Sequence, residues 1–487
     1  MEREKKNTIW FVLSGLALVA LFAAVVFLNE THPSTNTGDA STILIDDGDL
    51  KINWNSYNTY DVELSDTLTI TKSGVYHITG SLTDKNIIVN VSDGKVKLIL
   101  DNVAISNSTG PAIACYAADD LVIELVGENN LSDGNSYDAS YDEDVSGTIY
   151  SKADLTFQGE GTLNLTANYQ DGIVSKDDLK FISGTYNITA ADDGIRGKDS
   201  VYIVNGDFTV NAKGDAIKST NETTVGKGFV LIKDGNITIS SGDDGIHASK
   251  KLIIDGGTID IKKSYEGLEA QAITINDGAI SVISSDDGLN AGGGADASTT
   301  TNSQGAGAFD VNASCMLIIN GGTIYVNASG DGIDSNGYLY FNGGTVTVDG
   351  PTNNGNGALD AGAGIVMNGG TVIAVGASGM AETLGSSSSV YNASIYFSSY
   401  YSAGTKVEIK NSAGETIISH TSAKAFNHMS VGTSAFEQGE TYTIYVNGNS
   451  YTTFTISSIT TTVGASANNT NGGGMMPGGM TPSNSRR

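Results

Sequence analysis

The stretch "ISSGDDGIHASKKLIIDGGTIDI", Ile239 to Ile261, contains the two elements that decide the fold. The first is an acidic residue followed by glycine and a branched apolar residue, here Asp244-Gly245-Ile246. The second is a glycine turn, here "GGT" at 256–258. Both elements recur along the chain with one shared period, and such self-similarity is the signature of a repeat architecture.

The acidic residue of the first element recurs at steps of 22, 22, 29, 22, 21 and 44 residues. The step of 29 indicates one period plus an insertion at 219–228, and the step of 44 indicates two periods, with 291–308 in the first. Short alternating runs such as "KLIID" and "TIDIKK" predict strands with one buried face. Three such strands with three turns fill one period, which is one coil of a parallel β-helix. The leucine-rich repeat has a similar period, but its leucine pattern is missing.

The chain loses this period at both ends, which predicts caps on the solenoid because an open β edge invites aggregation. We expect an all-β protein with these parts: a basic tip and transmembrane signal anchor at 1–28, a polar spacer at 29–41, an N-terminal β cap at 42–85, the parallel β-helix at 86–389, a small antiparallel β region at 390–460, and a disordered Gly/Met-rich tail at 461–487.

The segment Ile9 to Leu28 has no charged residue over 20 positions and follows Arg3, Lys5 and Lys6. This length suffices to cross a bilayer as one helix, and the basic flank stays inside. A cleaved signal peptide is the alternative, but no clear A-x-A site is present. The segment predicts a single-pass protein of the cell membrane with its C-terminal domain outside the cell.

The net charge of −28 argues against a nucleic-acid partner, and it suits calcium, a high-salt medium or solubility. Cys115 and Cys315 lie about eight predicted coils, or roughly 38 Å, apart, which is too far for a disulfide. We expect two buried free thiols and a monomeric protein.

In a β-helix the seven acids of the first element stack in a column, which we expect to be interrupted only by the additional coil near residue 309. Like charges one coil apart repel by about 1 kcal/mol in water and more in a protein. Two remedies are open. Each carboxylate accepts backbone N–H bonds within its own turn, or Ca²⁺ binds between coils and takes oxygens from several of them. The candidate calcium ligands are Asp192, Asp193, Asp215, Asp243, Asp244, Glu266, Asp286, Asp287 and Asp331, of which Asp192, Asp243 and Asp286 are second carboxylates beside the column.

One residue past each acidic-Gly-apolar element lies a second row, which we expect to face outward because the preceding apolar residue faces in. The row changes from basic to acidic along the chain, and it suits a linear polymer that carries carboxylates; a merely solvated face is the alternative. Its candidate ligand-binding members are Arg196, Lys218, His247, Glu269, Asn290 and Asp334, with Val174 at one end and Asp360 at the other.

Segments such as "GVYHITGSL", "KVKLILDNVAI", "DGIVSKDDLKFISGTYNITAADDGIRGKDSVYIVNG" and "GETYTIYVNG" resemble the extracellular carbohydrate-binding domain proteins with a right-handed parallel β-helix, which are related to calcium-dependent pectate lyases. The resemblance covers roughly residues 42–460. It implies a polysaccharide partner, including acidic polymers or cellulosic glycans, with calcium as a structural or bridging ion.

Three functions stay open at this point. The first is a non-enzymatic, surface-anchored polysaccharide-binding protein. The second is a calcium-dependent polysaccharide lyase, in which the resemblance implies that Lys218 or Arg196 is the base. The third is an adhesin whose partner is not a carbohydrate.

Overall fold

The computed structural model describes residues 52–292 and 311–464. The chain divides into two compact units, residues 1–41 and 42–487, and all described residues belong to the second unit. Within them, no helix is long and apolar enough to cross a membrane. The predicted signal anchor at 1–28 and spacer at 29–41 lie outside the described residues.

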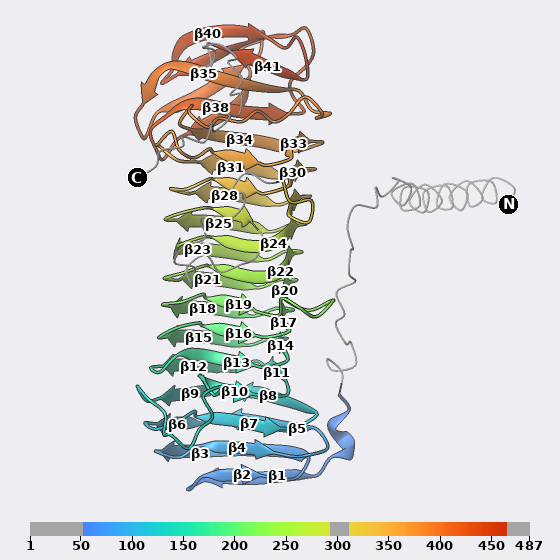
Figure 1. Ribbon diagram of the computed structural model, residues 1–487, viewed down its shortest axis with the longest axis vertical. Coiled ribbons are helices and arrows are strands. Elements are labelled where there is room, and N and C mark those ends of the chain that lie inside the picture. The colour runs from blue at the N-terminus through green and yellow to red at the C-terminus, as the bar shows by residue number, and fades with distance from the viewer. Residues whose placement is uncertain (1–51, 293–310, 465–487) are drawn as a thin grey trace, which may run out of the picture. The chain divides into compact units, whose positions relative to one another are not determined.

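The described residues form an all-β solenoid in which three strand stacks run through successive coils (Figure 1), and the predicted all-β class is confirmed. Strands of one stack pair in parallel with the next coil, which is consistent with the predicted parallel β-helix. A single short 3₁₀ helix, η2 (Trp54–Ser56), precedes the first strand among the described residues.

Stack I carries the acidic-Gly-apolar elements. It consists of β2 (Leu68–Ile70), β4 (Ile87–Asn90), β7 (Ile113–Ala117), β10 (Gly147–Ser151), β13 (Asp171–Ser175), β16 (Ile195–Gly197), β19 (Ile217–Ser219), the first parts of β22 (Ile246–Ile254) and β24 (Leu268–Ile275), β26 (Leu289–Ala291), β29 (Ile333–Ser335) and β32 (Leu359–Ala361).

Stack II follows stack I in each coil. It consists of β1 (Thr59–Leu64), the first part of β3 (Gly74–Thr83), β5 (Val96–Asp101), β8 (Asp120–Val126), β11 (Asp154–Gly159), β14 (Asp178–Phe181), β17 (Ser200–Ile203), β20 (Phe229–Ile232), the last parts of β22 and β24, β27 (Met316–Ile319), β30 (Tyr338–Phe341) and β33 (Gly364–Met367).

Stack III completes each coil, and a glycine turn precedes its strands from β9 onward. It consists of the end of β3, β6 (Ala104–Asn107), β9 (Glu128–Asp133), β12 (Thr162–Ala167), β15 (Thr185–Ala190), β18 (Asp207–Ala212), β21 (Asn236–Ser240), β23 (Thr258–Ser264), β25 (Ala279–Ser284), β28 (Thr323–Asn327), β31 (Thr345–Asp349) and β34 (Thr371–Gly376).

One apolar core runs through these coils and holds them together. The inward side chains of neighbouring coils lie one above another, for example Ile173, Ile195 and Ile217 in stack I, and all three are fully buried. Phe157 and Phe181 stack with ring centroids 5.1 Å apart and planes 7° apart. A single coil has no partner for its inner face, so the neighbouring coils supply the burial that stabilises it.

One prediction about the coils needs correction. The step of 44 residues is one coil rather than two, because β26 pairs directly with β29 and β24 with β27. Sequence spacing alone does not separate a coil from an insertion of equal length. The strands β1 to β3, which lie in the N-terminal β cap expected at 42–85, pair in parallel with the coils that follow them.

The C-terminal residues contain antiparallel strands, which differ from the coils. β38 (Phe426–Thr433) pairs antiparallel with both β34 and β35 (Asn392–Tyr401), and β41 (Thr460–Val463) pairs parallel with β35. The order β37-β36-β39-β40 forms a separate four-stranded antiparallel sheet, from β36 (Lys406–Lys410), β37 (Thr416–Thr421), β39 (Thr441–Val446) and β40 (Asn449–Thr455). β41 extends into the predicted tail, whose residues 465–487 lie outside the described residues.

Candidate functional site

The row one residue past each acidic-Gly-apolar element stacks in register over eight coils. We call it the polar row. Its members are successive Cα partners in the order Val174, Arg196, Lys218, His247, Glu269, Asn290, Asp334 and Asp360. The predicted adjacency of these residues is therefore present, and Asn290 and Asp334, between which we expected an additional coil, are also direct neighbours.

The seven acids of the repeated element form a second column beside the polar row, which we call the acid ladder. The Asp171 carboxylate accepts the N–H of Asp193 at 3.2 Å, and the Asp193 carboxylate accepts the N–H of Asp215 at 3.0 Å. In the same way, the Asp215 carboxylate accepts the N–H of Asp244 at 2.8 Å, and the Asp244 carboxylate accepts the N–H of Glu266 at 3.3 Å.

The ladder bonds correct the expected capping within each turn, because the donor belongs to the next coil. Each carboxylate lies against the equivalent turn of the next coil and accepts a hydrogen bond from the first amide of that turn. The glycine in the element allows the two turns to approach closely. Hydrogen bonds to a charged group contribute about 1.5–3 kcal/mol each. The ladder therefore ties consecutive coils together while it holds the acids one above another.

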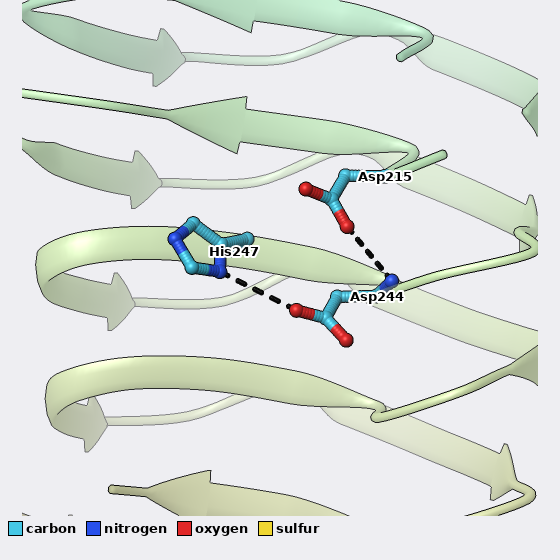
Figure 2. Close-up of side chains that lie close together, drawn as sticks. All are labelled: Asp215, Asp244 and His247. Atoms are coloured by element: carbon cyan, nitrogen blue, oxygen red, sulfur yellow. Dashed lines mark hydrogen bonds and ion pairs between the residues drawn. The ribbon is translucent and has the colours of Figure 1, made fainter. Parts of the chain in front are cut away.

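The first half of the site contains its own cations. An Arg196 guanidinium nitrogen lies 2.6 Å from an Asp171 oxygen, and the Lys218 ammonium lies 2.6 Å from an Asp215 oxygen. His247 Nδ1 lies 3.3 Å from Asp244 and 2.5 Å from Glu269. Figure 2 shows the imidazole of His247 directed at Asp244, whose backbone amide bonds to Asp215.

Hydrogen bonds and nearby charges favour the charged form of His247 in this half, although burial raises the pKa of Asp193 to about 7. Burial by itself lowers the pKa of His247, but hydrogen bonds to Asp244 and Glu269 outweigh burial and raise the pKa to about 10. Burial raises the pKa of Asp215 to about 6, although the positive charge of Lys218 opposes that change. The half is consequently a chain of alternating acids and bases.

The solvated face, which was the alternative for the polar row, is wrong for the middle of the row. His247 is 2% exposed and Glu269 is 4% exposed. The alternation of a strand tells which side a residue takes, but it does not tell what lies on that side. Here the acid ladder lies on the same side, and a buried charge persists only when it is paired.

The second half of the site has no basic residue in the polar row, which continues as Glu269, Asn290, Asp334 and Asp360. The pKa of Asp334 is raised to about 8. Burial is the largest cause, and the nearby charges of Asp287, Asp331 and Asp360 add to it. Burial and the charge of Asp331 raise the pKa of Asp287 to about 7.

Two further acids show the same environment. Burial and the charges of Glu269 and Asp244 raise the pKa of Glu266 to about 9, and burial and Asp360 raise the pKa of Glu382 to about 7. Asn290 donates to Glu266 at 2.9 Å, but its own side-chain oxygen is buried without a hydrogen-bond partner. The second half is thus acidic: its first row residue, Glu269, pairs with His247 of the first half, and the row holds no basic residue beyond it.

The second carboxylates expected beside the column flank it in the structure. The Oδ1 atoms of Asp192 and Asp193 both lie against Gly214 of the next coil, and those of Asp286 and Asp287 both lie against Gly330. A Cβ atom at Gly330 would be 2.4 and 2.3 Å from those two oxygens, so this turn requires glycine. Asp243 is half-buried beside Asp244.

Several acids are close enough to share one cation. Ligand atoms of Asp215, Asp244 and His247 lie within 4.8 Å of one another, and so do those of Asp244, Glu266 and Glu269. The protonated His247 opposes a cation in both groups. Calcium takes carboxylate and amide oxygens. Among the described residues, none of these close groups includes Asp286, Asp287, Asp331 or Asp334.

Two features of the structure were not predicted from the sequence. The first is another acidic group beside stack II, formed by Asp154, Asp177 and Asp178, and the doubled aspartate of "KDD" is its signal in the sequence. Lys180 pairs with Asp154 at 3.2 Å, and Lys227 pairs with Asp178 at 2.9 Å. A hollow of about 370 Å³ lies over stack III from β3 to β12, lined by serine, threonine and asparagine side chains. Its signal is the alternation in "TLNLTA".

The cysteine prediction is confirmed, because Cys115 and Cys315 are both buried and free. Burial raises the pKa of Cys115 to about 11, so its thiol stays protonated at neutral pH.

The chain is similar in sequence to one curated protein, one solved structure and one family model. A carbohydrate-binding domain-containing protein from Acetivibrio thermocellus is 32% identical over 160 residues, which cover 32% of this chain and 55% of that relative. A solved structure, the polysaccharide lyase-like protein from C. thermocellum, matches with 27% identity and a TM-score of 0.40 over 45% of this chain and 96% of that one. The sequence model of the family "Carbohydrate-binding domain-containing protein" matches residues 65–311, about half of the chain. The chain therefore belongs to the family of carbohydrate-binding domain-containing proteins.

Proposed function

We propose that this protein binds a polysaccharide without cleaving it, and that it does so at the cell surface. The observation that carries the proposal is the in-register polar row, which repeats a side-chain position on eight consecutive coils. A linear polymer also repeats its groups at a fixed step, so one chain contacts the half-buried members of the row, which are Arg196, Lys218, Asn290, Asp334 and Asp360. Val174, His247 and Glu269 are buried and lie outside this contact. The ligand is an acidic, polygalacturonate-like glycan or a cellulosic one, and membership of the carbohydrate-binding family supports this class. The charge-free segment Ile9 to Leu28 supports the surface location and a membrane partner.

Calcium binds the second half of the site in this proposal. The oxygens come from Asp286, Asp287, Asp331 and Asp334, and the unpartnered oxygen of Asn290 lies in the same row. Without a cation, mutual repulsion and burial favour protonated carboxyls there, as the raised pKa values of Asp287 and Asp334 indicate. A divalent cation replaces those protons and supplies the bridge that an acidic polymer needs at an acidic surface.

The ion pairs of the first half favour binding over catalysis. A general base must accept a proton, so it must be neutral and within reach of the substrate. Arg196 and Lys218 each lie 2.6 Å from a buried carboxylate, and the Lys218 side chain is only 13% exposed. Each of the two side chains is therefore held in an ion pair within the protein.

A direct test incubates the full chain with polygalacturonate and with a soluble cellulose derivative, with and without calcium, and follows both binding and the ultraviolet absorbance of an unsaturated product. Binding without product supports the proposal. Product formation that disappears in Lys218→Ala would establish the lyase instead. Failure to bind any carbohydrate on a glycan array would leave the non-carbohydrate adhesin as the function.

A further inference from the structure

Stack II carries an uncharged, partly aromatic surface patch far along the sequence from the basic half of the polar row. The outward residues of β27 are Met316 and Ile318, those of β30 are Tyr338 and Tyr340, and β33 contributes Val366. Their neighbours in sequence, such as Leu339 and Phe341, are buried in the core. None of the outward positions is charged, although the protein carries a net charge of −28.

The two tyrosines form a platform. The Tyr338 and Tyr340 rings lie 5.5 Å apart with planes 29° apart, and Tyr338 is 40% exposed. The Cα partner of Tyr338 in the next coil is Gly364, and a Cβ atom there would meet nothing within 4 Å. The neighbouring coil therefore leaves open space beside Tyr338.

A line of exposed asparagines runs along the same edge. Asn320, Asn342 and Asn368 follow β27, β30 and β33. The Asn342 amide donates to the Asn320 oxygen at 2.9 Å, and the Asn368 amide donates to the Asn342 oxygen at 2.9 Å. Each amide retains a second N–H and a second lone pair. The asparagines thus present aligned donors and acceptors at the coil repeat of about 4.8 Å.

We propose that this patch is a second carbohydrate site, specific for an uncharged polysaccharide. The apolar face of a sugar ring stacks on Tyr338 and Tyr340, and its hydroxyl groups bond to the asparagine line. A site with an apolar surface and a few aligned polar groups is typical of small-molecule recognition, and tyrosine combines a large apolar contact with low entropy cost. The absence of charge from the patch selects against acidic glycans. The inference rests on the proposed carbohydrate-binding function, but it uses a different strand stack from the polar row.

The experiment compares the full-length wild type with the double variant Tyr338→Ala/Tyr340→Ala in binding to hydroxyethyl cellulose and to polygalacturonate by isothermal titration. We expect the double variant to bind the neutral polymer about tenfold more weakly or worse, with unchanged binding to the acidic polymer. Tyr338→Phe keeps the ring and should bind the neutral polymer like the wild type. Tyr400→Ala, which removes another exposed tyrosine, is the matched control.

Equal melting temperatures show that the double variant is folded. Undiminished binding of the neutral polymer by a folded double variant would overturn the second site and leave the proposed function intact. Binding of the acidic polymer alone by the wild type would also overturn it, whereas binding of neither polymer would remove both proposals. Self-association that the double substitution abolishes would identify a second copy as the occupant and overturn the inference.

Discussion

The two halves of the acid ladder share one backbone arrangement but differ in charge balance. From Asp171 to Asp244, the carboxylates lie beside Arg196, Lys218 and His247. From Asp287 onward, the polar row offers only asparagine and aspartate. The fold tolerates both because the ladder bonds are made to backbone amides, which do not depend on the row residue. The backbone arrangement is thus repeated along the solenoid while the charges of the side chains change. The first half contains its own counterions, which we call self-neutralised, and the proposed calcium ion lies in the second half.

The largest effect should follow from removing a cation in the self-neutralised half. Lys218→Met leaves the fully buried Asp215 without its ammonium partner. Breaking a buried pair from one side costs about 3–5 kcal/mol, so we expect a loss of this size in the free energy of unfolding, measured by urea denaturation at pH 7. A loss below about 1 kcal/mol would contradict the view that the first half depends on internal counterions.

The next largest effect should be the stabilisation of the folded protein by calcium, which we expect to depend on the second half and not on the first. At a concentration of 100 times its dissociation constant, a ligand specific for the folded state stabilises it by about 2.7 kcal/mol. We expect calcium to raise the melting temperature of the wild type at pH 8. Asp287→Asn should abolish this increase, and the matched ladder variant Asp193→Asn should retain it. The reverse pattern would place the cation in the first half.

A smaller effect concerns Asp334 in the calcium-free protein. Its folded-state pKa of about 8 is raised above the unfolded value, so its contribution to stability is fully present below the unfolded pKa of 3.8 and is lost as pH rises through 8. Asp334→Asn removes the penalised charge. We expect it to stabilise the protein by about 1–2 kcal/mol at pH 8 and by much less at pH 5, measured by melting in a chelator. Destabilisation at both pH values would show that the carboxylate has a partner that the raised pKa does not reveal.

The smallest effect provides the baseline for the ion pairs. Lys262 pairs with Asp260 on β23, where both side chains are partly or largely exposed. Exposed pairs contribute about 0–1 kcal/mol because water screens them. Lys262→Met should change the free energy of unfolding by no more than this in the same urea titration. A change as large as that of Lys218→Met would mean that burial does not distinguish the two pairs.

The register of the site was predictable because equal sequence steps stack in a solenoid. Steps of 22 residues predicted that Arg196 lies above Lys218, and the shared marker extended the row through the 29-residue interval to His247. The 44-residue interval was misjudged, since an insertion and an additional coil have the same length in sequence. The tyrosine platform was not predicted, because its two tyrosines gain meaning only when Gly364 is found to leave space beside them.

The period, the all-β class, the stacking of the acids and the change from basic to acidic along the polar row could all be predicted from the amino-acid sequence. These follow from composition and spacing, which a repeating backbone converts directly into neighbours. The folded structure was needed to show that His247 and Glu269 are buried and that the ladder aspartates accept backbone N–H bonds from the next coil. Burial and hydrogen bonding depend on which groups from other coils fill the space around a side chain, and a linear pattern does not contain that information.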